Sequence, residues 1–279
     1  MDAVDLIFLG TGGGRFAMLT QTKWTGGIRI ISKDINAHLD PGPGALIYSL
    51  NLNLNPQKIN AVIVTHCHLD HYANAELLIE AMTQGMTKTA GLLAAPKSVL
   101  YGNDFCGPSI SRYHQQKPKE LIEMEPRTIF NIKDVTITVQ ECRHADPDAV
   151  GLKMAFPDIG VISYISDTEY FEGLGWAYKG SKLLVACVTR PSGSPIKGHM
   201  TTDDAIQVVN EARPETVIIT HFGMKMIYSG SSREAKKIEE ATGVHTVAAY
   251  DGMLVEVSGK VRVVGATKTT RNLRETLNT

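Results

Sequence analysis

The segment from residue 61 to residue 83 most strongly constrains the fold, because a strand pattern, a histidine-rich loop and a helix pattern follow one another without a break. Residues 61–65 read A-V-I-V-T, a β-branched run typical of a buried strand. Residues 74–83 place apolar side chains at helical spacing. The loop between them reads H-C-H-L-D-H. A strand that enters a helix through such a loop predicts an α/β fold with a functional site at the strand end.

The remaining apolar runs form two β-rich halves, each closed by helices. Strands are predicted in the first half at residues 6–9, 27–31 and 91–94, followed by a loop-rich region at 101–119. Further strands are predicted at residues 135–139, 150–156, 161–165, 183–189, 216–221, 245–250, 253–257 and 261–264. The predicted helices are residues 202–212, opened by a threonine cap, and residues 232–242, capped by Ser231 or Ser232.

The chain contains no internal repeat and no linker rich in proline and serine. We therefore expect one continuous domain over residues 1–265, followed by a polar tail over residues 266–279. The alternation of strands and helices predicts an α/β protein built as a four-layer αββα sandwich, with two mixed sheets flanked by helices.

Charge and cysteine content narrow the functional classes. The 28 basic and 29 acidic residues give a net charge of −1, so no global basic field indicates bulk nucleic-acid binding. The acidic N-terminal residues and the lack of a run of about 18 apolar residues predict a cytoplasmic protein without a membrane partner. The 4 cysteines form no C-x-x-C pair, so a metal ion would need other ligands.

Residue types that bind metals recur at other predicted strand ends. The segments E-C-R-H-A-D, I-S-D-T and I-T-H-F contain His144, Asp167 and His221. In the first loop, His66 and His68 can face one cation, while Asp70 and His71 lie beyond the turn and can face a second. Imidazole and carboxylate ligands suit Zn²⁺, with Mn²⁺ and Fe²⁺ as alternatives, so the sequence predicts two positions for divalent metal ions.

The four residues His66, His68, Asp70 and His71 fill the pattern H-x-H-x-D-H, and here the chain resembles the metallo-β-lactamase superfamily. That resemblance implies the αββα sandwich and a dinuclear centre whose metals hold a bridging hydroxide as the nucleophile. It implies that His144 completes the first metal site, that His221 joins Asp70 and His71 at the second, and that Asp167 bridges the two metals.

Other segments resemble the phosphodiesterase branch, which includes tRNase Z and the cyclic phosphodiesterase of phosphonate degradation. They are G-T-G-G near the start, S-D-T around Asp167, and G-H-M-T-T-D-D-A at residues 198–205. His68, where redox-active di-iron members have glutamate, argues for hydrolysis rather than oxygen chemistry. The resemblance implies that Asp70 and His199 are catalytic, with His199 protonating the leaving oxygen or stabilising the phosphate charge.

Two departures argue against tRNA processing. Cys187 stands where the tRNase Z segment H-E-A-T has glutamate, and only 22 residues separate His144 from Asp167, which leaves no room for a tRNA-binding arm. We therefore expect a compact phosphodiesterase whose substrate is a small-molecule or nucleic-acid phosphodiester. Hydrolysis of a lactone, ester or thioester, and a non-catalytic nucleic-acid-binding module, are the alternatives. The sequence leaves the oligomeric state open, a homodimer included.

Several further residues have expected roles. Asp40 in H-L-D-P-G is expected to orient a ligand imidazole, and Cys67 to pack away from the metals. Arg29 is a candidate substrate contact, whereas His38 on a predicted strand is expected to be structural. The basic segment at residues 111–119 could bind phosphates or single-stranded nucleic acid, or form a solvated loop.

Overall fold

The computed structural model describes residues 3–266, which divide into two compact units built from interleaved segments of the chain. Among the described residues, unit 1 contains 3–10, 24–123 and 251–266, and unit 2 contains 11–23 and 124–250. A single domain over residues 1–265 therefore stays a prediction. The predicted polar tail lies outside the described residues from residue 267 onward.

Unit 1 contains an eight-stranded mixed sheet with the order β15-β14-β1-β2-β3-β4-β5-β6. The strands β3, β4 and β5 are parallel, whereas β1 pairs antiparallel with β2 and with β14. The strands are β1 (Val4–Gly10), β2 (Thr25–Ile31), β3 (Asn36–Leu39), β4 (Ala61–Ile63), β5 (Leu92–Pro96), β6 (Glu120–Met124), β14 (Met253–Val257) and β15 (Val261–Ala266).

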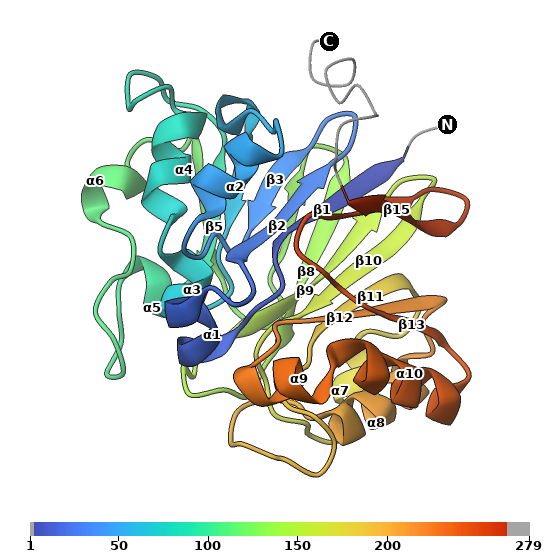
Figure 1. Ribbon diagram of the computed structural model, residues 1–279. Helices are drawn as coiled ribbons and strands as arrows, with labels where there is room; N and C mark the ends of the chain where they lie inside the picture. Colours follow the sequence, from blue (N-terminus) through green and yellow to red (C-terminus); the bar gives the residue numbers. More distant parts are fainter. Residues whose placement is uncertain (1–2, 267–279) are drawn as a thin grey trace. The chain divides into compact units, whose positions relative to one another are not determined.

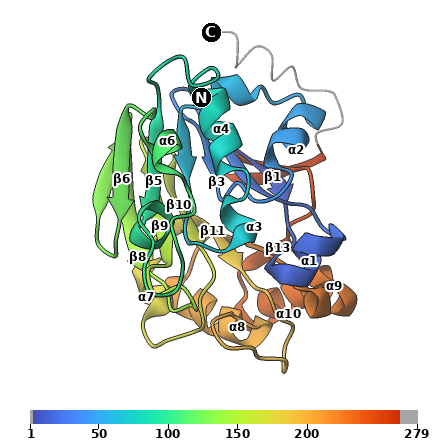
Figure 2. The ribbon, with the colours of Figure 1, turned by 90° about the vertical axis from the view of Figure 1, so that its left-hand side faces the viewer.

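The helices of unit 1 are short and lie in the connections between β3 and β6. They are α2 (Ala45–Asn51), the 3-10 helix η1 (Pro56–Lys58), α3 (Leu69–Tyr72), α4 (Ala75–Met82), α5 (Lys97–Leu100) and α6 (Arg112–Gln115). The apolar face of α4, including Leu78 and Ile79, packs in one buried cluster with Val62 and Leu93 from the sheet. In Figure 2, α4 lies in front of β3, as the helical spacing in the sequence predicts.

Unit 2 contains a seven-stranded sheet with the order β13-β12-β11-β10-β9-β8-β7. Its strands are β7 (Ile129–Ile132), β8 (Val135–Glu141), β9 (Val150–Phe156), β10 (Gly160–Ile165), β11 (Ser181–Cys187), β12 (Thr216–Thr220) and β13 (His245–Ala248). The strands β7 to β10 form an antiparallel meander, and β10 to β13 are parallel. The parallel strands therefore end at one edge of the sheet, where a site can form.

The helices of unit 2 are α1 (Gly14–Thr20), α7 (Leu174–Ala177), α8 (Thr202–Ala212), α9 (Met224–Ser229) and α10 (Ser231–Thr242). The side chain of Thr201 accepts a hydrogen bond from the Asp204 amide, and the Asp204 carboxylate accepts one from the Thr201 amide, so α8 begins with a capping box. Val208 of α8 and Ile238 of α10 share a buried cluster with Ile219 of β12. Figure 1 shows both helices on one side of the sheet of unit 2.

The prediction of an α/β fold with two mixed sheets flanked by helices is confirmed. The predicted cap of the last helix is wrong: Gly230 precedes the helix with φ 87°, and no side chain caps it. The sequence analysis also missed β6 and β7, which have only five and four residues. Within residues 3–266, no helix is long and apolar enough to cross a membrane.

Candidate functional site

The histidine loop of unit 1 begins directly after β4 and ends in the one-turn helix α3. His68 is the residue before α3, and Asp70 and His71 lie within it. The sequence predicted a helix only over residues 74–83; the structure adds a separate helical turn, α3, which holds Asp70 and His71 before α4. His66 and His71 are buried, so these imidazoles are held in fixed positions by their surroundings.

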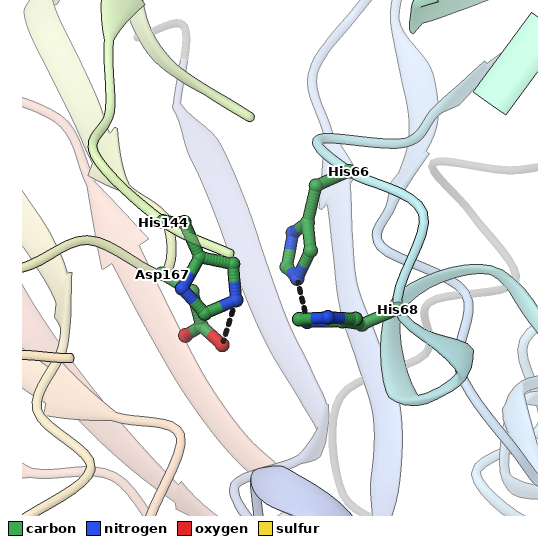
Figure 3. Close-up of side chains that lie close together, drawn as sticks. All are labelled: His66, His68, His144 and Asp167. Atoms are coloured by element: carbon green, nitrogen blue, oxygen red, sulfur yellow. Dashed lines mark hydrogen bonds and ion pairs between the residues drawn. The ribbon is translucent and has the colours of Figure 1, made fainter. Parts of the chain in front are cut away.

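The candidate ligands of unit 1 lie close together. His66 Nε2 is 3.1 Å from His68 Nδ1, as drawn in Figure 3. The ring centroids of His66 and His71 are 4.0 Å apart, and His71 Nε2 is 3.9 Å from Asp70 Oδ2. This part of the chain therefore gathers three imidazoles and one carboxylate, as the six-residue pattern predicts.

Asp40 orients His71 in the way that the sequence predicts. Its Oδ2 lies 2.9 Å from His71 Nδ1. The same carboxylate accepts hydrogen bonds from the amide and hydroxyl of Thr65, at 2.7 and 2.8 Å. Asp40 reaches these partners because β3 and β4 are parallel and end at the same edge. An acceptor at Nδ1 leaves Nε2 of His71 available to bind a metal ion.

In unit 2, Asp167 is surrounded by three histidines. Its carboxylate oxygens lie 3.0 Å from His221 Nδ1, 3.6 Å from His199 Nε2 and 3.8 Å from His144 Nε2. Figure 3 shows His144 beside Asp167. Asp167 is buried, with 2% of its surface exposed. Three residues predicted from separate strand ends, His144, Asp167 and His221, are therefore brought together, and His199 lies beside the same carboxylate.

Backbone contacts fix two of these histidines. His144 Nδ1 lies 2.6 Å from the carbonyl oxygen of Gly198, which has φ 77°. The amide of Gly198 donates to Glu169 Oε2 at 3.1 Å. Glu169 thereby holds Gly198, which precedes His199 and whose carbonyl oxygen contacts His144. The sequence analysis missed this role of Glu169, since no motif marks it.

His221 has a left-handed backbone conformation, with φ 62°, which a non-glycine residue adopts rarely. Its Nδ1 lies 3.0 Å from Thr189 Oγ1. Gly13 lies against the imidazole ring, and a Cβ atom at that position would be 2.2 Å from His221 Nδ1. The amide of Gly13 also donates to the carbonyl of Phe222 at 3.1 Å. The G-T-G-G-G segment thus packs against His221. The sequence analysis did not predict this contact.

Arg29 is not a substrate contact, because it is completely buried in unit 1. Its Nη2 donates to the Asn55 carbonyl at 3.2 Å, and burial lowers the pKa of Arg29 to about 9, so it stays charged at neutral pH. His38 is structural as predicted: its Nε2 lies 2.7 Å from the Gly26 carbonyl. Cys67 packs in the buried cluster of unit 1, as predicted.

The basic segment at residues 111–119 contains the short helix α6, which Ser111 caps through its side chain. His114 Nδ1 lies 3.1 Å from Glu76, and its Nε2 lies 3.2 Å from Glu80. These two carboxylates attach the segment to α4. His114 is therefore engaged within unit 1, while Tyr113 beside it is 61% exposed.

The donor chemistry of both units fits a divalent metal ion. Each unit groups imidazole nitrogens and carboxylate oxygens in buried or partly buried positions, and these are the ligand types that zinc and related cations prefer. Buried charges persist only where they are paired or bind a cation. The fold and these residues together define the class of metal-dependent α/β enzymes.

The chain belongs to the β-lactamase superfamily, because the family model described as the beta-lactamase superfamily domain matches residues 36–222. The match includes every residue that the sequence analysis proposed as a metal ligand. The resemblance inferred from the H-x-H-x-D-H pattern is therefore confirmed.

Several proteins are similar to this chain in sequence over most of its length. An uncharacterised protein of Methanocaldococcus jannaschii is 38% identical over 264 residues, covering 93% of this chain and 97% of that protein. A metal-dependent hydrolase of Myxococcus xanthus is 26% identical, covering 68% and 66%. Ribonuclease Z of Thermococcus kodakarensis is 21% identical, covering 89% and 93%. The protein is a metal-dependent hydrolase of this superfamily, and ribonuclease Z is among its relatives.

Solved structures show the same fold. The metallo-β-lactamase fold protein YhfI from Bacillus subtilis has a TM-score of 0.75 at 19% identity, covering 91% of this chain and 100% of that one. A diphosphatase of the PhnP family has a TM-score of 0.66 at 15% identity, covering 91% and 97%. Identities this low support the fold alone.

Proposed function

We propose that the protein is a phosphodiesterase that hydrolyses a nucleotide or nucleic-acid-like phosphodiester with two divalent metal ions. We propose zinc as the metal, because the candidate ligands are imidazoles and carboxylates. The observation that carries this proposal is the position of His199. Its Nε2 lies 3.6 Å from Asp167 Oδ2, within the G-H-M-T segment that the phosphodiesterase branch shares. A protonated imidazole at that point can donate a proton to a leaving oxygen of the substrate, close to the proposed metal ligands.

The proposed ligands come from both units. In unit 1 the donors stand in one loop and one turn of helix, and in unit 2 they follow strands of one sheet. The proposed metal ligands are His66, His68, Asp70, His71, His144, Asp167 and His221. When bound, two divalent ions supply an activated water and offset the negative charge of a phosphodiester.

The residues of the chain divide the remaining work. Asp167 would orient His144 and His221 as well as contribute its own oxygens, since it contacts both imidazoles. Asp40 holds the Nδ1 side of His71, which fixes the direction of Nε2. His199 would deliver a proton to the departing oxygen of the substrate. Asp70 is proposed as both a ligand and a catalytic carboxylate.

The first test measures metal content and the hydrolysis of bis-p-nitrophenyl phosphate on the same preparation. We expect about two metal ions per chain and turnover that chelation abolishes. Two ions without turnover of this diester, but with turnover of a lactone or thioester, would redirect the assignment to carbon-centred esters. Metal-dependent retention of nucleic acid without any turnover would favour a binding module, and a protein that binds no metal would contradict the proposal.

The role of His199 is tested separately with His199→Ala. We expect metal content to stay unchanged and the rate to fall by about 100-fold or more, since a positioned general acid contributes 10²–10⁴. The loss should be greater for a diester with a poor leaving group than for one with nitrophenolate. His245→Ala is the control, because His245 is exposed and its Nδ1 lies 3.1 Å from Glu239 Oε1. Equal losses with both leaving groups would exclude a proton-donor role.

A further inference from the structure

Cys187 lies in unit 2 with Asp167 and His221. The sequence analysis noted only that Cys187 stands where the tRNase Z segment has a glutamate. One donor atom from each of these three residues lies within 4.8 Å of the other two. All three residues are buried, and Cys187 has 1% of its surface exposed. The group therefore contains a carboxylate oxygen, an imidazole nitrogen and a sulfur atom, within reach of a single cation.

The sheet explains why these three residues meet. In the parallel register, Ile165 of β10 lies opposite Ala186 of β11, and Cys187 lies opposite Thr220 of β12. Asp167 follows β10 by two residues, Cys187 is the last residue of β11, and His221 follows β12 directly. Three adjacent parallel strands thus end together and present one donor each.

The strand also fixes the direction of the sulfur. Side chains alternate along β11, and Leu184 and Ala186 pack in the cluster covered by α8 and α10. Cys187 therefore points to the opposite face of the sheet. There its Sγ lies 3.4 Å from the hydroxyl of Tyr164, which is also buried. Tyr164 is positioned to donate a hydrogen bond to a thiolate.

We propose that Cys187 binds a divalent metal ion as a thiolate, as the third donor beside Asp167 and His221. This inference rests on the proposed metal-dependent function. On binding, the thiol proton leaves to solvent as the sulfur–metal bond forms, and the metal keeps its oxidation state. The thiolate then adds an anionic donor to the carboxylate of Asp167. A thiolate also favours Zn²⁺ or Co²⁺ over Mn²⁺, so Cys187 selects the metal as well as holding it.

The test replaces the native metal with Co²⁺ alone and records absorption spectra. We expect a near-ultraviolet sulfur-to-cobalt charge-transfer band in the wild-type protein, together with weaker visible bands of bound cobalt. Cys187→Ser should lose the ultraviolet band and keep the visible ones. Cys142→Ser is the matched control, because Cys142 is also buried in unit 2 but lies outside the donor group. It should keep both.

Bound cobalt without the ultraviolet band, or a band that survives Cys187→Ser, would overturn the ligand role. If hydrolysis of bis-p-nitrophenyl phosphate persisted in that case, the proposed function would stand alone. Failure to bind either cobalt or zinc would instead overturn the proposed function and this inference together.

A second measurement is needed if Cys187→Ser does not fold. X-ray absorption on zinc-loaded Cys142→Ser protein should show a sulfur neighbour at about 2.3 Å. A shell of only nitrogen and oxygen neighbours would overturn the proposal without any variant at Cys187.

Discussion

The candidate metal ligands of unit 1 and those of unit 2 are assembled in opposite ways. In unit 1 they occupy residues 66–71, one loop and one turn of helix. In unit 2 they follow separate strands, from His144 after β8 to His221 after β12. The first set depends on local chain geometry and a single bracing carboxylate, whereas the second depends on sheet register and on packing around Asp167.

This difference determines how many candidate ligands a single substitution disturbs. Asp167 contacts three histidines from three different segments, so its loss disturbs all of unit 2's donors. Asp40 contacts one histidine and its loop, so its loss acts on one donor of unit 1. Substitutions at the centre of unit 2 should therefore cost more activity than those at the brace of unit 1.

The largest effect is expected for Asp167→Ala. The substitution removes a proposed ligand and leaves His144 and His221 without their shared carboxylate. Turnover of bis-p-nitrophenyl phosphate should fall below detection, and metal content should drop in the same sample. Asp134→Ala, at an exposed turn between β7 and β8, should leave both unchanged. Full metal content in Asp167→Ala would show that this carboxylate is not a ligand.

Gly13→Ala is expected to have the next largest effect. An added Cβ would lie 2.2 Å from the ring of His221, so the imidazole must move. We expect activity to fall by about 10- to 100-fold, the usual cost of disturbing a group that orients a metal ligand. Gly107→Ala is the control, because a Cβ there meets nothing within 4 Å. An equal loss in both variants would rule out an effect through His221.

Asp40→Asn tests the brace of unit 1 with little change of shape. Asparagine tolerates the left-handed backbone at this position, where φ is 51°, so the fold should persist. The amide lacks the charge that binds the Nδ1 proton of His71, and we expect metal affinity to fall by about tenfold. Metal titration by calorimetry measures the change, with Asp34→Asn at an exposed turn as the control. A larger loss of metal affinity in Asp40→Asn than in Gly13→Ala, titrated in the same way, would reverse the proposed order of the units.

The same contrast explains what the sequence could predict. The six-residue pattern identified the donors of unit 1, because neighbouring residues in a loop are also neighbours in space. His144, Asp167 and His221 were found only by resemblance and strand-end position, since nothing local fixes which strands are adjacent. Gly13 and Glu169 act through contacts with residues far along the chain, so no spacing rule could identify them. The grouping of Cys187 likewise depends on the register of β10, β11 and β12.

The smallest effect is expected for His38, a structural histidine of unit 1 that is not a candidate metal ligand. Burial and the nearby charge of Arg29 lower the pKa of His38 from 6.5 to about 3. Between pH 6.5 and pH 3 the unfolded chain therefore binds a proton at His38 that the folded chain does not bind. This group stabilises the fold fully above pH 6.5, and its contribution is lost as the pH falls through that window.

His38→Gln removes this titration while keeping a side-chain donor for the Gly26 carbonyl. In urea unfolding of the metal-free protein, the free energy of unfolding of the wild type should fall more steeply with acid than that of the variant. The difference in slope has an upper limit of about 1.4 kcal/mol per pH unit, the value for one proton. His245→Gln, at an exposed position, is the control for the loss of an imidazole elsewhere in the chain. Parallel curves for wild type and His38→Gln would mean that His38 takes up a proton equally in the folded and unfolded protein, and that its burial does not exclude the charged imidazole.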